Sequence, residues 1–106
     1  MLKALVVDDE EDICEVLSET LREMGFQTST AMTGEEALQL TKKNEWDLCM
    51  VDMRLATAVT GLDVIKEVRT RWPKAVVIAM TGYVDLGLQQ ETQKLGVSGY
   101  FGKPDD

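Results

Sequence analysis

The chain has 106 residues, of which 44% are hydrophobic and 28% are charged, and its formal net charge is −8. This length suits one globular domain, and the acidic balance excludes the basic footprint of a nucleic-acid-binding protein and disfavours an anionic membrane. There is no histidine, which excludes a histidine-based catalytic or metal site. The two cysteines, Cys14 and Cys49, lie in apolar patterns typical of buried free thiols.

The first predicted strand is the apolar run Leu2–Val7, which ends at the acidic stretch 8–12. Apolar residues at a spacing of three and four then predict a helix over residues 11–24, and Gly25 is its natural stop. The more polar run 26–31 predicts an edge strand.

A capping-box pattern, Thr33–Glu36, opens the second predicted helix, which continues to about residue 44. Leu48–Val51 is an uninterrupted apolar run, typical of a strand buried on both faces. This run ends on a carboxylate, Asp52, and loop residues follow at once.

A second capping-box pattern, Thr60–Asp63, opens the third predicted helix, and Pro73 bars that helix from continuing. Residues 75–80 form another apolar run, which predicts a fourth strand buried on both faces. A weakly amphipathic helix over about 85–95 and a short strand over 98–101 complete the pattern.

Strands and helices therefore alternate strictly, beginning and ending with a strand. This alternation predicts an α/β fold: a doubly wound sandwich in which helices cover both faces of a five-stranded parallel sheet. The most apolar strands should be central and the polar second strand should be an edge, which the strand order 2-1-3-4-5 satisfies.

In this order, polar residues that follow four strands meet at the carboxyl edge of the sheet, where ligands of α/β proteins bind: Asp8, Asp9, Asp52, Thr81 and Lys103. Two carboxylates about 4 Å apart repel by roughly 4 kcal/mol at an effective dielectric near 20, and a divalent cation relieves this repulsion. An all-oxygen site suits Mg²⁺ or Mn²⁺. Asp52 can then act as a nucleophile toward phosphorus and form an acyl phosphate.

Several of these residues stand in familiar motifs. Val6-Val7-Asp8-Asp9-Glu10, Asp52, Met80-Thr81-Gly82 and Gly99-Tyr100-Phe101-Gly102-Lys103-Pro104 together resemble the receiver domain of bacterial two-component response regulators. The resemblance covers the whole chain and implies a flavodoxin-like fold. It also implies a phosphoacceptor switch, in which a phosphoryl group passes from the phosphohistidine of a histidine kinase or phosphotransfer protein with the help of Mg²⁺. No enzymatic activity is implied beyond the domain's own phosphorylation and dephosphorylation.

The resemblance assigns roles to the acidic residues. Asp52 corresponds to the phosphoacceptor and Asp9 to the direct Mg²⁺ ligand, while Asp8 acts mainly through water. Asp52 and the backbone carbonyl of Arg54 complete the implied protein ligands of the metal.

The resemblance also implies a switch that changes the face formed by the fourth helix and the fifth strand. Thr81 corresponds to a hydroxyl that moves to the phosphoryl group, Lys103 to its ion-pair partner, and Tyr100 to an aromatic ring that swings inward. Lys103-Pro104 matches a peptide bond that is usually cis in this family.

The chain departs from the family pattern in two places. The loop from Asp52 to Gly61 is one residue longer than usual, and Thr60 stands where an aspartate is common. The family's fifth helix is missing, so we expect apolar side chains of strands 1, 4 and 5 to be partly exposed and the chain to self-associate through that sheet face.

Two other functions compete with the switch. A pseudo-receiver would bind partners without being phosphorylated, and the intact set of site residues argues against it. A haloacid-dehalogenase-type phosphatase would need a second aspartate two residues after the nucleophile, where this chain has Arg54. No apolar run approaches the roughly 18 residues of a membrane span, and a signal-peptide pattern is absent, so we expect a cytoplasmic location. The sequence specifies neither the kinase nor the output domain or partner.

Overall fold

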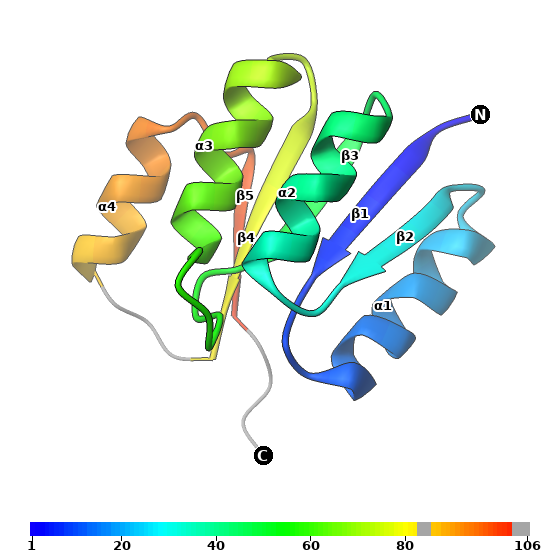
Figure 1. Cartoon of the computed structure of the whole chain (residues 1–106), viewed down its shortest axis with the longest axis horizontal. Coiled ribbons are helices and arrows are strands. Elements are labelled where there is room, and N and C mark those ends of the chain that lie inside the picture. Colours follow the sequence, from blue (N-terminus) through cyan, green and yellow to red (C-terminus); the bar gives the residue numbers. More distant parts are fainter. Residues whose placement is uncertain (83–85, 103–106) are drawn as a thin grey trace.

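Five parallel strands form a single sheet at the centre of the computed structural model, which describes residues 1–82 and 86–102 (Figure 1). Their order is β2-β1-β3-β4-β5, as the sequence predicts, with the polar strand β2 at an edge. The strand bounds are Lys3–Val7 for β1, Gln27–Ala31 for β2, Leu48–Asp52 for β3, Val76–Thr81 for β4 and Gly99–Gly102 for β5.

Four helices alternate with these strands and cover both faces of the sheet. The bounds are Glu11–Glu23 for α1, Gly34–Lys43 for α2, Gly61–Arg71 for α3 and Leu86–Lys94 for α4. Figure 1 shows α2 and α3 in front of the sheet. The arrangement is the predicted flavodoxin-like doubly wound fold. Within the described part of the chain, no helix has the length and apolar character needed to cross a membrane.

Local sequence signals set the helix ends. The predicted capping box at α3 is complete: the Thr60 hydroxyl accepts from the Asp63 N–H at 3.2 Å, and the Asp63 carboxylate accepts from the Thr60 N–H at 3.0 Å. At α2 the structure records one half of the predicted box, in which Thr33 accepts from the N–H of Glu36 at 3.1 Å. These bonds satisfy N–H groups that have no partner inside the helix.

Glycines end two of the helices. Gly25 follows α1 with φ of +100°, and Gly96 follows α4 with φ of +75°. After α1, the N–H of Gly25 bonds to the Arg22 carbonyl and that of Phe26 to the Leu21 carbonyl, which is the Schellman arrangement. The stop at Gly25 is as predicted, and α4 ends at Lys94, one residue before the predicted end.

The side chains of β1 alternate between two buried layers. Leu5 and Val7 belong to the cluster beneath α2 and α3, and Ala4 and Val6 to the cluster beneath α1. The prediction that strand 1 is partly exposed is therefore wrong for Ala4 and Val6, because α1 lies over them and buries them completely, whereas Leu2 at the start of the predicted strand is 55% exposed.

The same prediction is confirmed for the other two strands. Val76 on β4 is 44% exposed and Phe101 on β5 is 46% exposed. Both strands lie on the side of β3 away from β1, and this face is only partly covered, because Met80 of β4 is fully buried in the cluster beneath α1. Self-association through this face stays a prediction.

Candidate functional site

The carboxyl edge of the sheet brings three predicted site residues to one level. Val7 pairs with Val51, so Asp8 and Asp52 end neighbouring strands one step later, and neighbouring strands lie about 4.8 Å apart. Thr81 ends β4, the strand on the other side of Asp52. Asp8, Asp52 and Thr81 are 0%, 2% and 0% exposed, respectively. Charged side chains are seldom buried next to each other unless they have a function. This edge of the sheet is therefore the candidate functional site.

Three carboxylates gather where β1 runs into α1. Oxygens of Asp8, Asp9 and Glu10 all lie within 4.8 Å of one another, and exposure increases from buried Asp8 to exposed Glu10. The Glu10 N–H donates to Oδ1 of Asp8 at 2.9 Å, which fixes this turn. Asp52 is not part of this trio, within the residues that the structure describes.

Glu10 is a member of the acidic group that sequence reasoning missed. Glu10 is exposed and is the N-cap of α1, which begins at Glu11 as predicted. Its backbone is extended, with φ of −96° and ψ of 114°. Its position directly after the two aspartates was the available signal.

The backbone around Asp52 is held at several points. Arg54 donates its N–H to Oδ1 of Asp52 at 2.9 Å, and Met53 donates its N–H to the Met80 carbonyl at 2.8 Å. Gly61, the first residue of α3, lies against the carbonyl of Asp52. The carboxylate of Asp52 thus has a fixed position at the end of β3.

Thr81 and Tyr100 lie on the same face of the sheet. Tyr100 pairs with Ala79 and Gly102 with Thr81, so the two side chains are diagonal neighbours on β4 and β5. The Tyr100 ring packs against the core cluster beneath α2 and α3, and its hydroxyl oxygen is buried without a hydrogen-bond partner among the described residues. Lys103 and the Lys103–Pro104 peptide bond lie outside the described residues.

Both cysteines are buried and free, as predicted. Cys14 donates its thiol to the carbonyl of Asp8 at 3.3 Å and so supports the acidic turn from beneath. Burial raises the pKa of the Cys49 thiol to about 12, which keeps it protonated and unreactive at neutral pH. Neither cysteine belongs to the site as a nucleophile.

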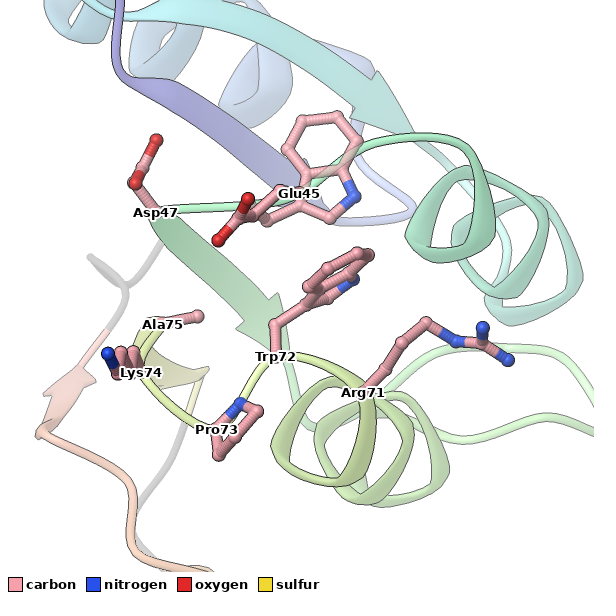
Figure 2. Close-up of a pocket in the computed structure, with 8 residues that line it drawn as sticks. Glu45, Asp47, Arg71, Trp72, Pro73, Lys74 and Ala75 are labelled. Atoms are coloured by element: carbon pink, nitrogen blue, oxygen red, sulfur yellow. The ribbon is translucent and has the colours of Figure 1, made fainter.

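A separate pocket of about 320 Å³ lies at the opposite, amino-terminal edge of the sheet (Figure 2). Its walls are formed by the segment before β3 and the segment between α3 and β4: Glu45, Trp46, Asp47, Arg71, Trp72, Pro73, Lys74 and Ala75. The indole N–H groups of its two tryptophans donate to backbone carbonyls of α2, Trp46 to Leu40 at 3.0 Å and Trp72 to Thr41 at 2.8 Å. The two tryptophans therefore bind α2 to the segments before β3 and β4.

The donors at the acidic edge fit a hard divalent cation. The side-chain donors gathered there are carboxylate oxygens, and they run from a buried to an exposed position within 4.8 Å of one another. Mg²⁺ prefers oxygen ligands and keeps several waters, so a half-open oxygen site of this kind suits it. The chemistry of the site is then electrostatic neutralisation beside a fixed carboxylate.

The fold and this edge define a doubly wound α/β domain with a candidate metal site beside a buried aspartate. The chain belongs to the family of response regulator receiver domains, because the sequence model of that family matches residues 4–106.

Three known proteins illustrate the similarity. The response regulator protein PilR of Pseudomonas aeruginosa is 38% identical over 104 residues, which are 98% of this chain and 23% of PilR. The sporulation initiation phosphotransferase F of Bacillus subtilis is 35% identical over 104 residues, which are 98% of this chain and 83% of that protein.

The third is a crystal structure of a response regulator protein from Burkholderia pseudomallei with a phosphorylated aspartic acid, a calcium ion and citrate. It has a TM-score of 0.91 and 27% sequence identity, and the alignment covers 100% of this chain and 62% of the other. The chain thus spans less than a quarter of PilR but most of the phosphotransferase.

Proposed function

We propose that this receiver domain is a phosphoacceptor switch whose acceptor is Asp52. The observation that carries the proposal is the position of Asp52: it is 2% exposed, ends the central strand β3 and lies one strand from the carboxylates of Asp8 and Asp9. The phosphorylated aspartate in the similar Burkholderia protein supports this choice.

In the proposed reaction, an Oδ atom of Asp52 attacks the phosphorus of a phosphohistidine on a histidine kinase or phosphotransfer protein. The new O–P bond forms as the P–N bond breaks, and the imidazole leaves with its electron pair and takes up a proton. Asp8, Asp9 and the backbone carbonyl of Arg54 would hold Mg²⁺, which neutralises phosphoryl oxygens when bound. Arg54 meanwhile orients the acceptor, because its N–H is already bonded to Asp52 at 2.9 Å.

The same proposal includes the switch. The aspartyl phosphate adds roughly −1.5 to −2 charges, which should draw the Thr81 hydroxyl toward it, with Lys103 as the ion-pair partner. Tyr100 shares the face of the sheet with Thr81, so a displaced Thr81 changes the packing of Tyr100 and thereby the α4–β5 face. If shifts in the NMR spectrum on phosphorylation skipped residues 86–102, this coupling would be wrong.

The test of the function is labelling by acetyl phosphate with Mg²⁺, followed by mass spectrometry. We expect a gain of one phosphate on Asp52, no gain in Asp52→Asn, and no gain when the metal is chelated. Undiminished labelling of Asp52→Asn would contradict the assignment. No labelling of the wild type would favour a pseudo-receiver, and turnover of many equivalents of substrate would favour a phosphatase.

A further inference from the structure

The loop that follows Asp52, residues 53–60, is tied to the start of α2. The hydroxyl of Thr57 accepts from the N–H of Gly34 at 3.2 Å and donates to the carbonyl of Val59 at 2.7 Å. Gly34 is the first residue of α2, and its N–H is one of the four that have no partner inside a helix. A loop 23 residues away in sequence therefore completes the cap of this helix.

Gly34 and Val59 are also in direct contact. A Cβ added at Gly34 would lie 2.1 Å from the Val59 carbonyl oxygen and 2.7 Å from the Val59 Cβ, so only glycine allows the loop to approach this closely. The contact between the loop and α2 therefore depends both on the hydroxyl of Thr57 and on the absence of a Cβ at Gly34.

The two ends of the loop contact Asp52. Near its start, Arg54 bonds to Oδ1 of Asp52, and just beyond its end, Gly61 packs against the Asp52 carbonyl. Between these ends, Leu55 is buried in the core cluster and anchors the first half of the loop, and Thr57 holds the second half through its two hydrogen bonds. The neighbours of Thr57, Ala56 and Ala58, are exposed and provide no alternative anchor in the core.

We propose that Thr57 is a positioning residue, which sets the geometry of Arg54 at Asp52 by holding the loop against the N-terminus of α2. The effect of Thr57 on phosphorylation rests on the function proposed above, because Thr57 would act through Arg54, whose carbonyl is a proposed metal ligand. The geometric part of the proposal does not depend on that function and is measured separately.

Three substitutions test the contact between the loop and α2, and two of them separate the Thr57 hydroxyl from the rest of its side chain. Thr57→Ser keeps both hydrogen bonds, whereas Thr57→Val keeps the shape and loses both. Gly34→Ala attacks the contact from the other side, by steric overlap with Val59. Thr70→Val is the matched control, because Thr70 is an exposed threonine on α3.

The first measurement uses amide NMR and hydrogen exchange on the unphosphorylated protein without metal. In Thr57→Val and Gly34→Ala, we expect the amide resonance of Arg54 to move. In Thr57→Val the Gly34 amide should also exchange about fivefold faster or more, the loss typical of one hydrogen bond. Thr57→Ser and Thr70→Val should match the wild type. An unchanged Arg54 resonance in Thr57→Val, with faster exchange confined to Gly34, would overturn the proposal.

The second measurement is the Mg²⁺ concentration that gives half-maximal labelling by acetyl phosphate. Thr57→Val should raise it by about threefold or more, since a displaced ligand weakens the metal site, and Thr57→Ser should restore the wild-type value. Equal values for wild type and Thr57→Val would overturn the role in the reaction. If the wild type is not labelled at all, the proposed function fails, and the Arg54 resonance still decides the role of Thr57.

Discussion

Gly61 lies directly against the backbone of Asp52. A Cβ added at Gly61 would be 2.1 Å from the carbonyl oxygen of Asp52 and 2.8 Å from the Cα of Met53. Since Gly61 is the first residue of α3 and Asp52 the last of β3, helix and strand meet at this contact. A glycine is needed here because of space, since a backbone atom is the nearest neighbour.

Gly61→Ala should therefore destabilise the domain by about 2 kcal/mol or more, at the upper part of the range for overpacking, because backbone atoms cannot move aside as a side chain can. The measurement is urea denaturation followed by far-ultraviolet circular dichroism. Gly99→Ala is the control, since its Cβ would meet only the Ile78 side chain at an ordinary 3.8 Å. Equal midpoints for the two variants would contradict the prediction.

The acidic trio predicts unequal roles for Asp9 and Glu10 in metal binding. Asp9→Asn should weaken Mg²⁺ binding by about tenfold or more, the loss that follows even from removing outer ligands. Glu10→Gln should weaken it less, because Glu10 is exposed and its charge is screened by solvent. Calorimetric titration of the unphosphorylated protein measures both, and a larger effect for Glu10→Gln would reverse the assignment.

The capping box at α3 predicts a pH dependence of stability. The hydrogen bond from the backbone of Thr60 lowers the pKa of the Asp63 carboxyl, with smaller contributions from the Thr60 hydroxyl and the charge of Lys66. A carboxyl whose pKa is lowered in the folded state stabilises the fold at pH values above its pKa in the unfolded state, which is about 3.9. This stabilisation is lost as the pH falls through the folded value.

The difference in stability between wild type and Asp63→Asn should accordingly be constant from pH 7 to about pH 5 and shrink as the pH falls below about 4. Urea midpoints measured across this range check the prediction, and Glu67→Gln on the same helix is the control. A difference that grows toward low pH would contradict it.

Trp72→Phe should destabilise the domain by about 1 kcal/mol or more, because the carbonyl of Thr41 loses the indole donor at 2.8 Å. Tyr100→Phe is a matched control that also removes one polar hydrogen from a partly buried ring. Its hydroxyl has no hydrogen-bond partner in the described part of the chain, so its loss should be neutral or stabilising. Equal losses in the two variants would show that the indole bond contributes nothing.

Signals that are local in sequence predicted most of the fold. The apolar runs gave β1, β3 and β4 within a residue or two, and Thr60, Asp63 and Gly25 marked helix ends through hydrogen bonds among near neighbours. The strand order followed from the polar character of β2 and from the strict alternation. Because parallel strands end at one edge, this order also brought Asp8, Asp52 and Thr81 together.

Contacts between distant segments could not be predicted in the same way. The bond between Thr57 and Gly34 joins a loop to a helix, and neither residue stands in a local pattern that points to the other. The burial of Ala4 and Val6 depends on where α1 lies across the sheet, which its periodicity does not determine. The gathering of the Asp8, Asp9 and Glu10 carboxylate oxygens depends on the turn between β1 and α1, which the charge pattern alone does not determine.

Helix α2 has ten residues, and a helix of that length is marginal in water on its own. It is nevertheless fixed at both ends, to the Thr57 loop at its N-terminus and to two indole groups at its C-terminus. Neither end can fray without breaking contacts to segments that directly adjoin β3 or α3. Helix α2 should therefore open only together with the central sheet, and native-state exchange should place its amides in the same cooperative unfolding unit as those of β3.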